Sequence, residues 1–170
     1  SKAADRVMKN VSVFIENKLG LKVNMTKSKV SKPNDIKYLG FGFFMDKNDG
    51  LWKAKPHAKS VEKLKLKLKK LTSRRWSISL DERLEKIKKT IVGWTNYYKI
   101  GYWKNIARLI DAHVRFRLRM CIWKQWKKVK TKKKALISLG VPKREAWMLA
   151  NSRKAYASCA SSFLNNVLTN

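Results

Sequence analysis

The sequence predicts a mainly α-helical protein: a short α+β segment with a β-hairpin, then a three-helix bundle and a small helical tail. Two observations lead to this fold class. Apolar residues recur at steps of three and four along several segments, which is the spacing of one face of a helix. Near the N-terminal end, an aromatic-rich run at residues 38–44 and a second run at 51–55 flank a polar stretch at residues 46–50, which is typical of two strands joined by a turn.

The composition indicates a polyanionic partner. The 170 residues carry a formal net charge of +30, and 44% of them are hydrophobic. The hydrophobic fraction allows a packed core, whereas the charge opposes folding unless a polyanion neutralises it. Nucleic acid is the first partner expected and an anionic membrane surface the second. Residues 51–134 hold 27 Lys and Arg against 5 Asp and Glu, so most of the cationic surface is expected in the bundle.

Metal and membrane signals are absent from the sequence. Cys121 and Cys159 lie far apart, and His57 and His113 have no second ligand at useful spacing, so we expect no metal or cofactor in this chain. No apolar run approaches the ~18 residues that span a bilayer, and no signal peptide is apparent. We therefore expect a cytoplasmic protein. The chain opens in a helical pattern without an initiator Met, so we also expect a piece of a longer protein.

The N-terminal segment predicts a helix and a hairpin. A stripe of Val7, Val11, Ile15 and Leu19 indicates a helix that ends at Gly20. A short strand is then predicted at residues 21–23, followed by a polar, basic turn.

Residues 38–44 predict a strand with two glycines, which in strands often mark a bulge or the close approach of another backbone. A turn at residues 46–50 and a return strand at 51–55 complete the hairpin, and Pro56 is expected to end it.

The first bundle helix combines an apolar seam with a lysine-rich face. Ser60 is its expected cap, and the seam runs from Val61 through Leu64 and Leu68 to Leu71. The lysines of this helix are offset only by a single glutamate; they are Lys59, Lys63, Lys65, Lys67, Lys69 and Lys70. Solvated helix faces usually mix charges of both signs, so a single-sign face favours phosphate contact over simple solvation.

The second bundle helix begins after a loop that contains Arg74 and Arg75. Ser79 and Glu82 match a capping box at its start. Its apolar seam steps alternately by four and three residues and consists of Leu80, Leu84, Ile87, Ile91, Trp94 and Tyr98. A glycine such as Gly93 makes a helix about 1 kcal/mol less stable than an alanine would. A second helix that crosses close to this position would explain why glycine is present.

The aromatic residues at the end of this helix, within residues 91–99, allow two interpretations. They could stack on nucleic-acid bases, or they could fill the core at a buried helix end.

The third helix is predicted over residues 103–128. Its inward residues are Ile106, Leu109, Ile110, Val114, Leu118, Cys121 and Ile122. Two cationic rows share its spacing, one of Arg108, Arg115 and Arg119 and one of Arg117, Lys124 and Lys128.

The tail predicts three short helices after a basic linker at residues 130–134. They cover residues 135–139, a segment after Pro142 with Ala146, Trp147 and Leu149 inward, and residues 153–168.

Several stretches resemble group II intron-encoded reverse transcriptases. Residues 19–24 (LGLKVN), 27–29 (KSK) and 38–41 (YLGF) are similar to the end of the palm in that family, where the last of them corresponds to the primer grip. The resemblance places Lys27 near the phosphates of the incoming nucleotide, where a cation would stabilise the leaving pyrophosphate. Lys27 is thus a candidate catalytic residue.

The bundle resembles the thumb, or maturase domain, of the same family. Residues 93–99 (GWTNYYK), 117–119 (RLR) and 123–127 (WKQWK) carry this likeness, which extends from about residue 3 to residue 134. The resemblance implies three parts: the end of the palm at 1–55, the thumb at 56–134 and the start of a DNA-binding domain at 135–170.

One departure from the family concerns catalysis. The Tyr-Ala-Asp-Asp box, whose aspartates hold the two metal ions, is absent from the sequence. The chain alone is therefore not expected to polymerise DNA, although Mg²⁺ is expected for an intact polymerase, and activity with a complementing fragment stays open.

The resemblance implies group II intron RNA, an RNA–DNA template–primer duplex, target DNA and the fingers–palm part of the enzyme as partners. The alternative is a generic basic RNA-binding module without a polymerase partner. The predicted nucleic-acid-binding residues are Lys29, Tyr38, Gly40, Phe41, Lys63, Lys67, Lys70, Arg74, Arg75, Asn96, Tyr97, Lys99, Arg108, Arg115, Arg117, Arg119, Lys124 and Lys127.

Overall fold

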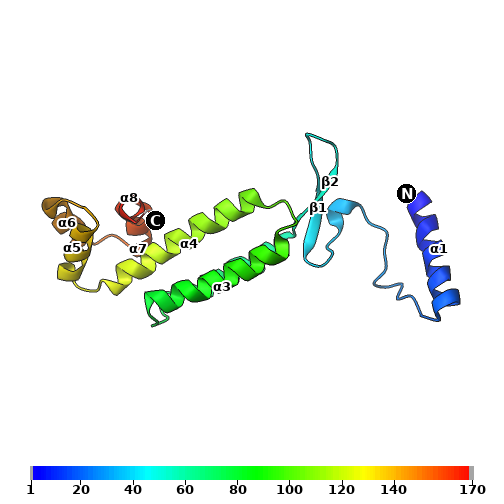
Figure 1. The fold of residues 1–170 in the computed structure, drawn as a ribbon, viewed down its shortest axis with the longest axis horizontal. Coiled ribbons are helices and arrows are strands. Elements are labelled where there is room, and N and C mark those ends of the chain that lie inside the picture. Colours follow the sequence, from blue (N-terminus) through cyan, green and yellow to red (C-terminus); the bar gives the residue numbers. More distant parts are fainter. Residues whose placement is uncertain (1, 169–170) are drawn as a thin grey trace.

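The computed structural model describes residues 2–168, which contain eight α-helices and one two-stranded antiparallel sheet. The mainly α class with a short hairpin is therefore confirmed. The helix α1 lies at one end of the molecule, the hairpin follows, and the tail helices lie at the other end (Figure 1). The elements in chain order are α1 Lys2–Leu19, the 3₁₀ turn Pro33–Asp35, β1 Phe41–Met45, β2 Trp52–Pro56, α2 Ala58–Leu71, α3 Leu80–Tyr98, α4 Lys104–Gln125, α5 Val129–Ser138, α6 Lys143–Ala150, α7 Tyr156–Ser161 and α8 Phe163–Val167.

The helix α1 forms as predicted but buries none of its residues. Its apolar stripe is open to solvent, with Val7 59% and Phe14 56% exposed. Gly20 ends the helix in the left-handed region with φ 62°, which glycine adopts at little cost. The predicted strand at residues 21–23 is wrong, since this segment pairs with no strand of the described chain.

The predicted hairpin is present in the structure, but its first strand begins three residues later than predicted. Residues 38–41 form a tight turn, in which the Tyr38 N–H donates to the Phe41 carbonyl at 2.9 Å. Leu39 (φ 47°) and Gly40 (φ 83°) both have positive φ, which turns the chain before β1. The strands then pair from Phe41 opposite Pro56 to the far end at the 46–50 turn.

The start of α2 differs from the prediction, whereas the start of α3 agrees with it. His57, not Ser60, caps α2, because its Nδ1 accepts from the Lys59 N–H at 3.1 Å. Ser60 lies in the first turn, and its hydroxyl donates to the Gly40 carbonyl at 2.9 Å. At α3, the Ser79 hydroxyl accepts from the Glu82 N–H at 3.1 Å, as the capping box predicts.

The first core cluster joins α2, α3 and α4. Its buried members are Leu64, Leu68, Ile87, Ile110 and Val114. Two predicted core residues are wrong: Leu84 is 42% exposed and Leu109 is 64% exposed. Arg83 is buried in place of its neighbour Leu84, because the buried face of α3 passes through residue 83, four residues before Ile87.

The second core cluster lies in the tail and includes residues of α4. Its buried members are Trp123, Leu136, Ala146, Ala150, Cys159 and Leu164. The α4 helix therefore contributes to both clusters, and it ends at Gln125 rather than at 128.

Three details of the predicted tail are wrong. The linker at 130–134 belongs to α5, and Trp147 is 57% exposed. The single helix at 153–168 is divided into α7 and α8, since Ser162 departs from helical backbone angles with φ −96° and ψ −112°.

Candidate nucleic-acid interface

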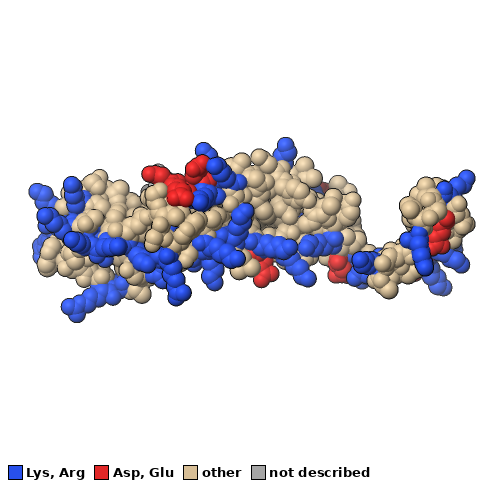
Figure 2. All heavy atoms as spheres, turned by 90° about the horizontal axis from the view of Figure 1, so that it is seen from below, with Lys and Arg blue, Asp and Glu red and all other residues tan. Residues whose placement is uncertain are grey.

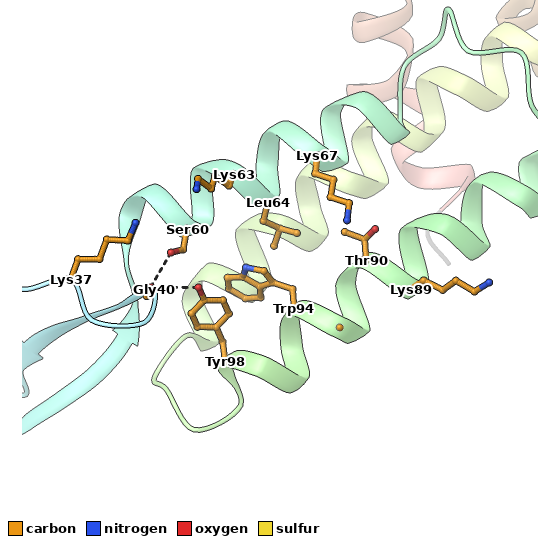
Figure 3. Close-up of a pocket in the computed structure, with 11 residues that line it drawn as sticks. Lys37, Gly40, Ser60, Lys63, Leu64, Lys67, Lys89, Thr90, Trp94 and Tyr98 are labelled. Carbon is orange, nitrogen blue, oxygen red and sulfur yellow. Dashed lines mark hydrogen bonds between the residues drawn. The ribbon is translucent and has the colours of Figure 1, made fainter.

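A groove of about 520 Å³ runs between α2 and α3 beside the tight turn at residues 38–41 that precedes β1. Four lysines line it: Lys63 and Lys67 from α2, Lys89 from α3 and Lys37 from the segment before the hairpin (Figure 3). None of the described residues that line it is acidic. The groove is therefore a site of positive potential, formed chiefly by Lys37, Lys63 and Lys67, because the Lys89 ammonium also pairs with the Glu85 carboxylate at 2.7 Å.

The helical repeat explains the lysines of the groove. Lys63 and Lys67 are four residues apart on α2, so they project from the same face above the buried Leu64. Leu64 and Trp94 give the groove an apolar floor.

Gly93 also lines the groove and does not have its predicted role. A Cβ atom at this position would meet nothing within 4 Å, so no helix crosses closely there. The missing side chain instead widens the groove.

The aromatic stretch of α3 attaches the hairpin to the bundle. The ring of Tyr98 lies 4.4 Å from that of Trp94 and 4.9 Å from that of Phe41, measured between centroids. Tyr98 and Phe41 are only 6% and 9% exposed, so for these two rings the core interpretation applies. Tyr97 is 54% exposed, and its hydroxyl donates to the Leu39 carbonyl at 2.7 Å.

Gly40 is required at the contact between the hairpin and α3. A Cβ atom there would lie 2.4 Å from the Tyr98 hydroxyl oxygen, and the φ of 83° also disfavours a side chain. Its carbonyl accepts from the His57 N–H and from the Ser60 hydroxyl, both at 2.9 Å. These contacts fix one end of the groove before any ligand arrives.

The buried Arg83 organises the loop between α2 and α3. It is 2% exposed, and its guanidinium donates to the carbonyls of Leu71, Ser73 and Trp76. Sequence reasoning missed this residue because arginine was counted as surface charge. The available signal was its position on the same helix face as Ile87.

Two of the predicted nucleic-acid-binding arginines bind backbone carbonyls within the protein. The Arg117 Nε donates to the Thr72 hydroxyl at 2.6 Å, and its Nη2 donates to the carbonyls of Lys69 and Thr72 at the end of α2. Arg119 donates to the carbonyls of Ala160 and Leu168, both at 3.2 Å, and so holds the tail. The two cationic rows predicted on α4 are therefore not uniform open faces.

Arg108 and Arg115, from the first of these rows, are exposed on α4. The Arg115 guanidinium pairs with the Asp111 carboxylate at 2.9 Å.

The other predicted site residues lie at different places on the surface. Lys27 and Lys29 follow α1 in the chain, and neither is among the residues that line the groove. Tyr38, in the turn before β1, is 64% exposed. The remaining predicted residues, all exposed on the bundle side of the hairpin, are Lys70, Arg74, Arg75, Asn96, Lys99, Lys124 and Lys127.

The perturbed titratable groups do not form a catalytic cluster. Hydrogen bonds from Lys53 lower the pKa of Asp46 and of Asp49, and the same contacts stabilise the hairpin turn. Burial, together with Arg117, lowers the pKa of His113. Within residues 2–168, no group of three or more His, Cys, Asp or Glu could hold a metal ion.

The surface charge has a coherent distribution on the face that Figure 2 shows. Lys and Arg gather in a band along the length of the body, whereas Asp and Glu form a few small groups. An even scatter of charge would have argued against a polyanion partner, and this face does not show one.

The fold and the site thus define a cationic helical protein with a lysine-lined groove between two helices of its bundle. Residues 61–138 match the family model of the group II intron, maturase-specific domain. This match supports the resemblance to the C-terminal part of a group II intron maturase, and a maturase-specific domain implies intron RNA as a partner. A search of curated proteins gives no match. None of the described helices is both long enough and apolar enough to cross a membrane.

Proposed function

We propose that this chain is the RNA-binding part of a group II intron maturase and that the groove between α2 and α3 holds the phosphate backbone of the intron RNA. The observation that carries the proposal is a groove with four lysines and no acidic residue among its described lining. Phosphate neutralisation supplies most of the non-specific affinity of such surfaces. It would also relieve the self-repulsion that a net charge of +30 creates.

The contacts at the hairpin end support this function by preorganising the groove. Gly40, Phe41 and Tyr98 hold the hairpin against α3, so the helices need not rearrange when RNA binds. A molecule that binds only one conformation of its partner stabilises that conformation. If this chain binds the folded intron RNA in preference to the unfolded RNA, it favours the RNA conformation that can splice.

The same surface is a candidate for a second ligand, the template–primer duplex of reverse transcription. Its regular phosphate backbones suit a lysine-rich groove, and target DNA could be bound in the same way. The catalytic aspartates and their Mg²⁺ would belong to a fingers–palm part outside this sequence. We expect no polymerisation by this chain alone, and the role of Lys27 at incoming phosphates depends on that missing part.

The groove is tested by comparing two triple variants that lose the same charge. Lys63→Gln, Lys67→Gln and Lys89→Gln remove groove lysines, whereas Lys65→Gln, Lys88→Gln and Lys104→Gln remove lysines that do not line it. For the unaltered chain, we expect log Kd for an RNA duplex to change with log salt concentration by a slope magnitude of about 5 or more. The groove variant should lower this magnitude by roughly 2–3 and the control by less than 1. Equal losses would reject the groove as the binding site.

Gly93→Ala gives an independent test without a change of charge. The site has room for a Cβ atom, and Ala is favoured over Gly within a helix by about 1 kcal/mol, so the fold should be as stable or more so. A backbone strand lying close to α3 would meet the added methyl group, so we expect RNA affinity to fall. An unchanged Kd with a raised Tm would mean that RNA does not approach this helix face.

The alternative function is a generic basic RNA-binding module without a polymerase partner. The observation that favours it is the extent of the family match, which covers residues 61–138 and neither the hairpin nor most of the tail. Competition between a group II intron RNA and an unrelated structured RNA of equal length separates the two. Equal competition would support the generic module, and preference for the intron would support the maturase.

A further inference from the structure

We propose that the loop between α2 and α3 binds one unpaired nucleotide of the RNA partner by stacking its base against Arg74. The inference rests on the proposed function, since it requires RNA as the ligand. It concerns a site at the other end of α3 from the hairpin, separate from the groove.

Two adjoining hollows surround the side chain of Arg74. One, of about 400 Å³, also contains Trp76, Arg83 and Lys127, and the other, of about 330 Å³, contains Arg75 and Tyr156. Lys124 lines both hollows, and the described lining of neither includes an acidic residue. A negatively charged ligand with a flat, uncharged part would suit this combination of cations and aromatic rings.

The stacking platform is already assembled in the free protein. The Arg74 guanidinium lies over the Tyr156 ring, 4.7 Å from its centroid. Tyr156 is 38% exposed, and Arg74 is exposed. Bases of unpaired nucleotides stack on aromatic rings and on guanidinium planes. Because the Arg74 guanidinium is already held against the Tyr156 ring, it loses little conformational entropy when a base binds.

The loop that carries Arg74 is held by contacts from three directions. Arg83 binds the carbonyls of Ser73 and Trp76, on either side of Arg74. The Lys124 Nζ donates to the Arg74 carbonyl at 2.7 Å, which leaves two further N–H groups of that ammonium for a phosphate. Arg119 secures the tail through the Ala160 carbonyl, and α7 thereby presents Tyr156 to the loop.

The groove and the loop differ in the chemistry that they offer. The groove presents lysines to the ligand, while the ring of Tyr98 is buried and offers no face for stacking. It therefore suits a regular phosphate backbone whose bases are already paired. The loop presents a planar cation on an aromatic ring, and Gln125 and Ser77 in the same hollow supply donors and acceptors for a base edge. An unpaired nucleotide is the part of a folded RNA that can use such groups.

The experiment compares three RNA hairpins of the same stem: fully paired, with one bulged nucleotide, and with an abasic bulge. The bulged hairpin should bind the full chain about tenfold more tightly than the paired one, as expected for one stacked base. The abasic bulge keeps the phosphate and removes the base, so its affinity should fall to that of the paired stem. Equal affinity for the two bulged hairpins, or for all three, would overturn the inference.

Arg74→Lys is the decisive variant because it keeps the charge and removes the plane. We expect it to abolish the preference for the bulge while affinity for the paired stem is unchanged, and Tyr156→Leu should act likewise. The groove triple variant should weaken all three hairpins by the same factor. A preserved bulge preference in a folded Arg74→Lys chain contradicts the stacking site and leaves the proposed function standing, whereas failure of every hairpin to bind the unaltered chain overturns both.

Discussion

The lysines of α2 carry the same charge as Arg83 of α3 and Arg117 of α4 but lie in different surroundings. Lys63, Lys67 and Lys70 are exposed on α2. Arg83 and Arg117 point inward and donate to the carbonyls at the end of α2 and in the loop that follows. The cationic residues of this chain therefore divide into a surface set and a structural set.

The difference follows from the chemistry of the two head groups. A guanidinium offers five N–H donors in a plane and is weakly hydrated, so it can satisfy several carbonyls at a helix end. An ammonium is compact and strongly hydrated, so it stays in water until a phosphate replaces that water. A count of net charge does not distinguish these two roles.

The largest expected effect is the loss of Arg83. Arg83→Met leaves the carbonyls of Leu71, Ser73 and Trp76 without their donor, so we expect the free energy of unfolding to fall by about 3 kcal/mol. Urea unfolding measures this change. Arg75→Met, at an exposed position in the same loop, is the matched control and should cost less than about 0.5 kcal/mol. Similar losses in both variants would show that Arg83 does not organise the loop.

An exchange of head groups tests the comparison more finely. Arg117→Lys keeps the charge but loses the fork that binds Thr72 and Lys69, so stability should fall by about 1–2 kcal/mol with affinity for a fully paired RNA stem unchanged. Lys67→Arg in the groove should leave stability unchanged. Thermal unfolding and RNA titration of the two variants provide the measurements. If Lys67→Arg lost stability and Arg117→Lys did not, the assignment of surface and structural cations would be reversed.

The smallest expected effect is a pH dependence that involves His113. Because burial and nearby cations lower its pKa in the folded chain, the unfolded chain binds more protons near the ordinary histidine pKa of about 6.5. Stability should therefore decrease as pH falls through that value and be fully present above it. The urea midpoint at pH 7.5 and pH 5.5 measures this, and His113→Gln should show a smaller difference. An identical pH dependence in the variant would place the titration at another group.

The elements built from neighbouring residues were predictable. The end of α1 at Gly20, the Ser79 cap and the α2 seam depend on spacings of three or four residues, which the sequence displays directly. The same argument found Lys63 and Lys67 of the groove, whereas Lys37 and Lys89 were not predicted to bind nucleic acid. The predictions that were wrong, such as the strand at 21–23 and Leu109 in the core, required knowledge of a packing partner.

The sequence by itself determined that this protein is helical and cationic and that it resembles group II intron maturases, because periodicity, charge and short motifs are local properties. Only the tertiary structure decided which cations are structural and which face outward. Arg117 meets Thr72 across 45 residues, and Arg74 meets Tyr156 across the boundary between bundle and tail. Contacts between such distant positions arise from the packing of whole helices, and no local pattern of residue types encodes them.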